Sequence, residues 1–146
     1  MRTPTLVLAV LLLVSCGDDN PTNGDTANVE GVWTASLSDM TGSGVSCSST
    51  IPTTLAITQD GTDFSGTYSG GELTCTEPGG TSSIPVEPGE IVNGRVNGEE
   101  VDFDLDTPDF HLTGIADGDA IFGRAHWTVD DGTGAMTLSG DWSATR

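Results

Sequence analysis

Lysine is absent from this chain of 146 residues, and its basic side chains are four arginines set against 22 acidic residues. The net charge of −18 repels nucleic acid and the headgroups of anionic lipids, which argues against both as direct partners. The same charge attracts cations and basic proteins. A strongly solvated surface is the simpler explanation of the composition, and we prefer it.

Helical periodicity and long apolar runs are missing as well. Past the N-terminus the apolar residues come in short bursts without the 3.6-residue spacing of an amphipathic helix, so essentially no helix is expected there. The longest apolar run covers nine residues, Leu6–Val14, whereas a membrane-spanning helix needs about 20. These absences leave an all-β fold as the expectation.

The N-terminus has the layout of a bacterial secretory signal peptide. Arg2 supplies the positive start, the apolar run follows, and a small residue precedes a cysteine. The last four residues, Leu13-Val14-Ser15-Cys16, resemble the lipobox of bacterial lipoproteins. The resemblance implies cleavage after Ser15 and fatty acylation of Cys16, for example with palmitate, as the first residue of the mature chain. An ordinary signal peptide or a short membrane anchor is the alternative.

Three segments follow from this start. They are a signal peptide over 1–15 that is removed, a flexible acidic tether over 16–29, and one domain over 30–146. Removing the signal takes away one arginine and no acid, so the mature net charge becomes −19. We expect a monomer held by its lipid in the bacterial cell envelope, outside the cytoplasm. In a Gram-negative source the expected location is the outer membrane.

Two cysteines remain in the exported domain, Cys47 and Cys75. Oxidising conditions outside the cytoplasm favour a disulfide between such a pair. In the chain-entropy model, closing a loop of this length stabilises the fold by roughly 3–4 kcal/mol. The sequence therefore predicts one disulfide bridge.

From Glu30 onward, apolar and polar residues alternate between glycine-containing turns, which is typical of half-buried antiparallel strands. The alternation predicts eight strands, over about 31–38, 54–59, 62–69, 90–97, 100–106, 109–116, 120–129 and 134–145. A ninth, short strand is an option at Glu72–Cys75.

Five of these strands share a short repeat in which a glycine lies between apolar or small residues two positions away on either side. The glycines are Gly66, Gly94, Gly114, Gly123 and Gly140. Each shares a face with its apolar neighbours and lets the strand coil tightly, which favours an eight-stranded up-and-down antiparallel barrel over a flat sandwich. The side chains expected to point inward are Trp33, Ala35, Leu37, Leu55, Ile57, Phe64, Tyr68, Val92, Val96, Val101, Phe103, Leu105, Phe110, Leu112, Ile121, Ala125, Trp127, Met136, Leu138 and Trp142.

Three dipeptides, Asp60-Gly61, Asn97-Gly98 and Asp117-Gly118, predict tight type I′ hairpin turns. In an up-and-down barrel all three lie at one end. The long connections 39–53 and 70–89 lie at the other end, and each carries one of the two cysteines, so the disulfide joins two loops of one rim. The tether enters at the tight-turn end, which directs the loop-bearing rim away from the membrane.

At both ends of this domain the sequence resembles the lipocalin- and avidin-like (calycin) barrels. The similar segments are Gly31-Val32-Trp33 and Trp142-Ser143-Ala144-Thr145-Arg146. The resemblance implies that Trp33 and Trp142 are structural residues of the barrel floor and that an arginine stacks on Trp33. Arg146 is the first candidate for that arginine and Arg124 the second. The polar residues with which avidins hold biotin are not recognisable, so biotin is not implied.

Residues for catalysis or metal binding are few. His111 and His126 fall on outward faces, and a zinc site needs three or four converging ligands. No strained serine nucleophile or oxyanion site is recognisable. We therefore expect neither an enzyme nor a bound metal or cofactor.

Three acidic clusters are candidates for calcium binding. They are Asp117-Gly118-Asp119, Asp130-Asp131 and the alternating Asp102, Asp104 and Asp106. None fits a twelve-residue calcium loop of the EF-hand type. The alternating aspartates are explained as the solvent face of a strand, since side chains two apart on a strand share a face.

The expected interior holds three tryptophans, three phenylalanines and the tyrosine, which favours a packed core over a ligand cavity. The inward glycines still leave room for a shallow pocket toward the rim. The expected role is a non-enzymatic binding module for a small apolar ligand. One alternative is a protein-binding module, such as an inhibitor of a basic hydrolase like lysozyme, to which Ser65-Gly66-Thr67-Tyr68 has a short similarity. A purely structural envelope protein is another.

Overall fold

The computed structural model describes residues 25–130, 132 and 134–146, which form strands joined by turns. None of these residues forms a helix long and apolar enough to cross a membrane. The strands are β1 (Gly31–Gly42), β2 (Val45–Ile51), β3 (Thr53–Asp60), β4 (Asp63–Ser69), β5 (Glu72–Glu77), β6 (Gly80–Pro85), β7 (Gly89–Asn97), β8 (Glu100–Leu105), β9 (Phe110–Asp117), β10 (Ala120–Asp130) and β11 (Ala135–Thr145).

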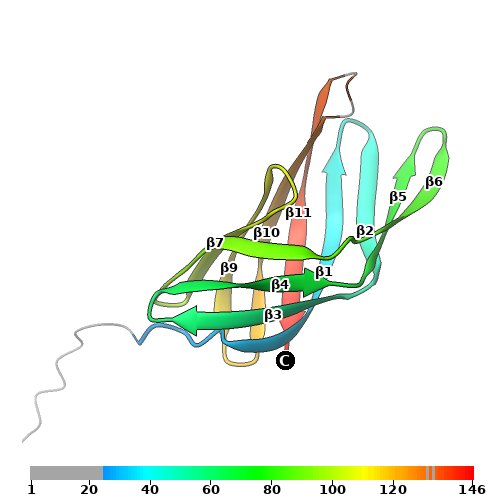
Figure 1. The fold of residues 1–146 in the computed structure, drawn as a ribbon. Coiled ribbons are helices and arrows are strands. Elements are labelled where there is room, and N and C mark those ends of the chain that lie inside the picture. Colours follow the sequence, from blue (N-terminus) through cyan, green and yellow to red (C-terminus); the bar gives the residue numbers. More distant parts are fainter. Residues whose placement is uncertain (1–24, 131, 133) are drawn as a thin grey trace, which may run out of the picture.

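Eight strands close into an antiparallel barrel in the order β1, β3, β4, β7, β8, β9, β10, β11 (Figure 1). The ring is completed where β11 pairs with β1, from Thr34 opposite Thr145 to Leu37 opposite Trp142. The predicted fold class is confirmed, and the barrel is compatible with a calycin-type fold. Closure leaves no unpaired edge in the barrel itself.

Three further strands, β2, β5 and β6, extend the same sheet past β1 in the segments that were expected to be loops, and we call this extension the side sheet. Past the barrel, β1 pairs with β2, β2 pairs with β5, and β5 pairs with β6. Figure 1 shows the β5–β6 hairpin projecting away from the barrel. More than half of the residues of β2 and β6 are Ser, Thr or Gly, so these two strands lack the regular apolar alternation of the barrel strands. Only the strand expected at Glu72–Cys75 was anticipated, and it is β5.

A bulge allows the first half of β1 to pair within the barrel and its second half to pair with β2 of the side sheet. The pairing of β1 with β11 shifts register between Ser38 and Thr41, and Asp39 has a φ of 51°. A bulge bends its strand and increases the local twist. The second half of β1 is thereby directed out of the barrel toward β2.

The three tight turns have a different geometry from the one predicted. Each is a two-residue loop that begins with glycine, because the strand residues on either side of the loop pair with each other. Gly61, Gly98 and Gly118 have φ of 64°, 62° and 59°, and the residue after each has no positive φ. Glycine in the first central position is the type II′ pattern, so the type I′ assignment was wrong.

The N-terminal segment forms part of the closed end of the barrel. Ala27 donates its N–H to the Gly98 carbonyl at 2.8 Å, and Val29 is fully buried. The C-terminal boundary expected for the tether, residue 29, is therefore too late in the chain, because residues 27–29 belong to the domain. Its first part, 16–24, lies outside the described residues. The chain enters at the tight-turn end.

The core fills the inside of the barrel and contains the expected inward residues with one exception. Ile91, at 2% exposure, takes the place predicted for Val92. The pairing of β7 with β8 shifts between Val92 and Arg95, and Asn93 has a φ of 56°. This bulge moves the alternation by one residue. Among the residues that the structure describes, the buried core falls between Val29 and Ala144, so we expect residues 25–146 to fold as one domain.

The repeated glycines lie where neighbouring strands approach too closely for a side chain. A Cβ added to Gly66 would overlap the Ala56 carbonyl oxygen, and one added to Gly123 would overlap the Thr113 carbonyl oxygen. Both obstacles are backbone atoms of the adjacent strand, which cannot move aside as a side chain can. The geometry supports the interpretation that these glycines permit tight coiling.

We expect Gly123→Ala to lower the free energy of unfolding by about 1–3 kcal/mol, the range for overpacking a tight site. Urea denaturation followed by tryptophan fluorescence measures the change. Gly79→Ala is the matched control, because nothing lies within 4 Å of its added Cβ and its φ is ordinary. The control should stay within about 0.5 kcal/mol of the parent. Equal losses in the two variants would contradict the explanation.

Candidate functional site

The half of the barrel opposite the tight turns contains a cavity of about 240 Å³ that opens at the rim. Its wall is mainly apolar and comes from inward positions of the barrel strands. Representative lining residues are Leu37, Leu55, Phe103, Leu105, Phe110 and Trp142. Concave apolar sites with a few polar groups are the usual form of small-molecule sites.

The aromatic side chains explain why only half of the barrel is hollow. Phe64 packs edge-on against Phe103 with ring centroids 5.6 Å apart, and Phe103 packs against Trp142 at 5.4 Å. Phe103 and Trp142 line the cavity, whereas Phe64 and Trp33 lie below it. The expected packed core is present toward the tight turns. The pocket toward the rim, for which the sequence prediction left room, is also present.

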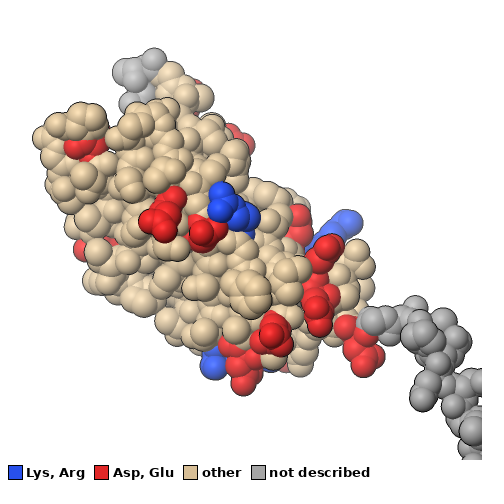
Figure 2. Space-filling view, turned by 180° about the vertical axis from the view of Figure 1, so that it is seen from behind, with Lys and Arg blue, Asp and Glu red and all other residues tan. Residues whose placement is uncertain are grey.

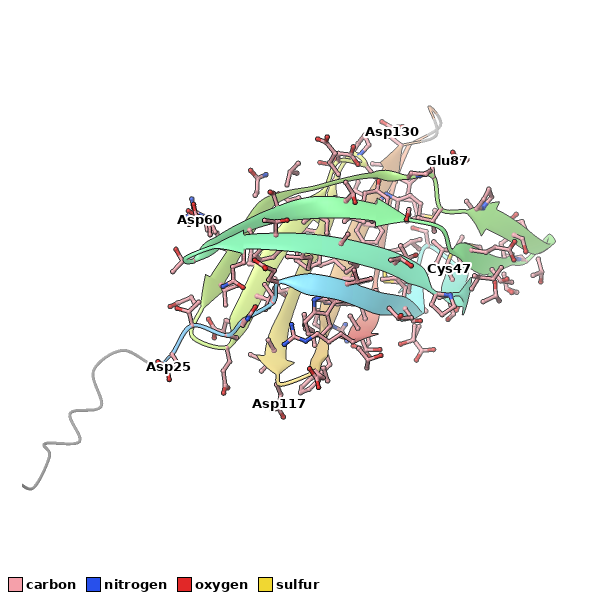
Figure 3. All side chains as sticks on the ribbon, turned by 60° about the horizontal axis from the view of Figure 1, so that its bottom comes forward. Asp25, Cys47, Asp60, Glu87, Asp117 and Asp130 are labelled. Carbon is pink, nitrogen blue, oxygen red and sulfur yellow. A yellow bond between two sulfur atoms is a disulfide. The ribbon has the colours of Figure 1, made fainter. Side chains whose placement is uncertain are left out.

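One side of the cavity is formed by residues 84–88, the end of β6 and its connection to β7, which we call the strap. Its residues Ile84 to Glu87 line the cavity (Figure 3 labels Glu87). The Val86 N–H donates to the Gly71 carbonyl at 3.1 Å, which ties the strap to the start of β5. Pro85 and Pro88 restrict its backbone further.

The predicted disulfide is present. Cys47 on β2 and Cys75 on β5 lie directly opposite each other in the pairing of the two strands, and their sulfurs are bonded. The bond attaches the β5–β6 hairpin to β2, which in turn pairs with the end of β1. Since β5 and β6 supply Leu73 and Ile84 to the cavity wall, the disulfide also secures one side of the mouth.

Tyr68 is the main buried polar side chain of the cavity wall. Its hydroxyl lies 2.8 Å from an Asp106 carboxylate oxygen and 2.7 Å from the Thr107 hydroxyl. Burial raises the pKa of Tyr68 above its ordinary value of 10.0, and the bond to Asp106 acts in the same direction. Tyr68 is therefore protonated at neutral pH. Tyr68 points into the barrel and is only 4% exposed.

The closed end of the barrel places Arg146 over Trp33, with the guanidinium carbon 4.5 Å from the ring centroid. Arg146 donates from Nη1 to the Glu30 carbonyl at 2.8 Å and from Nε to Asp119 at 3.0 Å. Trp33 donates its indole N–H to the Val29 carbonyl. These contacts join the two ends of the described chain and cover the barrel floor.

The other two residues considered for the floor lie elsewhere. Arg124 is on the outer surface, where it pairs with Asp141. Trp142 lies higher in the barrel, at the bottom of the cavity, and donates its indole N–H to the Thr113 carbonyl at 2.8 Å. Its role is therefore to separate the packed half from the hollow half.

The two histidines lie on the outside of the barrel and opposite each other on β9 and β10. His111 Nδ1 is 2.7 Å from Asp104, and His126 Nδ1 is 2.8 Å from Ser139. Within the described residues no group of three or more His, Cys, Asp or Glu side chains could hold a metal ion. Of the acidic clusters, Asp106 contacts Tyr68 of the cavity wall, Asp119 contacts Arg146 at the floor, and Asp104 contacts His111 on the outer face.

The pKa of Asp104 is lowered from its ordinary value of 3.8 by the hydrogen bond from Asn93, and next by the one from His111. A carboxyl with a lowered pKa stabilises the fold above its unfolded-state pKa, and the contribution is lost as the pH falls through the folded-state value. Asp104→Asn should therefore weaken the protein more at pH 6 than at pH 2.5. Urea midpoints of parent and variant at both pH values test this. A difference independent of pH would contradict it.

Carboxylates are spread over the face shown in Figure 2, with few basic groups among them. The arginines that the structure describes each lie beside a carboxylate. The pairs are Arg95 with Asp63, Arg124 with Asp141 and Arg146 with Asp119. None of these arginines lines the cavity.

Several site residues were not anticipated from the sequence. Glu87 and Ile84 lie in a segment without regular alternation, and Asp106 looked like one more solvent-facing aspartate. The two prolines of the strap, Pro85 and Pro88, were the signal in the sequence for an ordered connection. The signal peptide 1–15 and the lipidation site Cys16 lie outside the described residues.

No family model matches the chain, and no significant match was found among curated proteins or solved structures.

Proposed function

We propose that this chain is a bacterial lipoprotein, anchored through Cys16, whose barrel binds a small apolar ligand. The cavity of about 240 Å³ carries the proposal. An apolar cavity of about 150 Å³ is enough to hold benzene, while pockets for drug-sized ligands usually exceed about 300 Å³. The expected ligand is therefore small, of the size of a short alkyl chain or a bicyclic ring.

The position of the cavity supports the same role. It opens at the end opposite to the one where Ala27 joins the barrel. A tether attached at the tight-turn end directs the mouth away from the membrane, where a ligand can enter. Binding rather than catalysis is proposed, because the histidines lie outside the barrel and the polar side chains that line the cavity are hydroxyls, indoles and the Glu87 carboxylate.

The inhibitor hypothesis predicts a filled barrel and a protruding acidic rim. The hollow upper half favours the ligand hypothesis over it.

Titration of the 25–146 domain with 1-octanol tests ligand binding. Trp127 and Trp142 line the cavity, so a saturable change in tryptophan fluorescence is expected. Ala35→Phe should abolish the change, because Ala35 lines the cavity and a ring would fill it. Ala56→Phe is the control, since Ala56 points outward from β3. Absence of a saturable change in the parent, or its persistence in Ala35→Phe, would overturn the proposal.

The anchor is tested separately by mass spectrometry of the N-terminal peptide of the protein recovered from cell membranes. A diacylated Cys16 at the first position is expected. An unmodified cysteine or cleavage at another residue would overturn the lipoprotein assignment.

A further inference from the structure

We infer that the cavity selects its ligand by charge: it binds apolar amines best, apolar alcohols less well, and apolar carboxylates worst. This inference rests on the proposed function, since it names the class of ligand for the same cavity. It rests on the hydrogen-bonding capacity and the charge of the groups at the mouth.

The Tyr68 cluster offers acceptors and no free donor. A carboxylate can only accept, so Tyr68 donates its single proton to Asp106. The Thr107 hydroxyl, 2.7 Å from the Tyr68 oxygen, must then donate to it. Both hydroxyl protons are used inside the cluster. What remains for a ligand is the lone pairs of Tyr68 and Thr107, which line the cavity.

The charged groups near the mouth are all negative. Glu87 of the strap lines the cavity, and Asp106 lies directly behind Tyr68. Arg95, Arg124 and Arg146, the cations of the described chain, are outside the cavity and paired with carboxylates. A carboxylate ligand therefore meets like charge without a compensating cation. An ammonium group meets opposite charge.

The other polar groups of the wall are neutral and do not reverse this preference. They are the hydroxyls of Ser36, Ser49 and Thr53 and the indole N–H groups of Trp127 and Trp142, the last of which donates to the Thr113 carbonyl. The Ser49 oxygen already accepts the Leu37 N–H at 2.9 Å. A hydroxyl can donate to an alcohol or a carboxylate, but these neutral groups carry no positive charge to offset the repulsion between a carboxylate ligand and the side chains of Glu87 and Asp106. Neutral alcohols are therefore tolerated.

The steric fit at the Tyr68 cluster is close. A Cβ on Gly89, the first residue of β7, would overlap both the Tyr68 hydroxyl and the Asp106 carboxylate. Because glycine stands there, Asp106 can approach Tyr68 from outside the cavity. The carboxylate is thus placed behind the hydroxyl, where it polarises the acceptor that faces a ligand.

The test compares octylamine, 1-octanol and octanoate, which share one chain length and differ in the head group. Dissociation constants are measured by tryptophan fluorescence on the 25–146 domain at pH 7. We expect octylamine to bind about tenfold more tightly than octanol, and octanoate at least tenfold more weakly than octanol. Raising the salt concentration to 0.5 M should reduce both differences in affinity, because the head group stays near solvent and salt screens its interaction with the carboxylates.

Variants locate the source of the preference. Glu87→Gln and Asp106→Asn should each reduce the ratio of octylamine affinity to octanol affinity by about three- to fivefold. Glu77→Gln removes one negative charge from an exposed position of β5 that does not line the cavity, and it should leave the ratio unchanged.

The outcomes separate this inference from the proposed function. If octanol binds but octylamine binds no more tightly, or if octanoate binds equally well, the charge selection is wrong and the ligand cavity stands. If Glu77→Gln lowers the ratio as much as Glu87→Gln, the preference comes from the overall charge and the assignment to the mouth is wrong. If none of the three probes binds, both proposals fail.

Discussion

Replacing Trp33 with alanine should lower the free energy of unfolding by about 3–5 kcal/mol, the range for removing a buried aromatic side chain. Trp33 is fully buried at the barrel floor, so its loss leaves a cavity between strands that cannot collapse in a closed ring. The substitution also leaves the Val29 carbonyl without its indole donor and the Arg146 guanidinium without the ring beneath it. Urea denaturation of the 25–146 domain measures the change.

Val32→Ala is the matched control. Val32 is the preceding residue of β1 but points outward and is 64% exposed, so its truncation should change stability by less than about 0.5 kcal/mol. A loss below about 1 kcal/mol for Trp33→Ala would mean that the floor contributes little to the barrel. Trp33→Phe should fall between the two, because it keeps most of the apolar volume and loses the indole donor.

Removing the disulfide in the double variant Cys47→Ser/Cys75→Ser should destabilise the domain by about 3–4 kcal/mol. The two cysteines are separated by 28 residues, and the chain-entropy model assigns this value to a loop of that length. The side sheet has no large apolar core to replace the bond, since β6 is exposed along its whole length. Urea denaturation under non-reducing conditions compares the variant with the parent.

A second readout of the same variant concerns the cavity. The β5–β6 hairpin contributes Leu73 and Ile84 to the wall, so loosening it should weaken octanol binding as well as stability. Ser82→Ala, opposite Cys75 on β6, is the control for a polar change in the side sheet that keeps the bond. A stable double variant with unchanged octanol affinity would show that the bond secures neither the domain nor the mouth.

Some features of the site were accessible from the sequence and others were not. Trp33, Arg146 and the two cysteines are identifiable because each is rare in this chain and lies in a recognisable context. Glu87 and Asp106 are not, because 22 acidic residues make any one of them unremarkable until a partner is known. Asp106 gains its significance only from Tyr68, which is 38 positions away in the chain.

The exchange of Val92 for Ile91 in the core shows the limit of period-two reasoning. Alternation predicts a face correctly as long as the strand is regular, and it did so for the other inward positions. One extra residue in β7, accommodated by Asn93 at positive φ, reverses the pattern upstream of it. The sequence Val92-Asn93-Gly94 carries no unambiguous sign of that bulge.

The amino-acid sequence by itself determined the strands with their alternating faces and the glycines in the turns and at the closest approaches between strands. From these features it also predicted a closed eight-stranded barrel with one disulfide. These follow from the side-chain period of a strand and from the conformational freedom of glycine, which act over a few residues. The tertiary structure decided how the aromatic rings divide the interior, which leaves a cavity of about 240 Å³ above Trp142. It also decided that β2, β5 and β6 extend the same sheet past the barrel. Both outcomes depend on packing between segments distant in the chain, and local sequence patterns do not encode such distances.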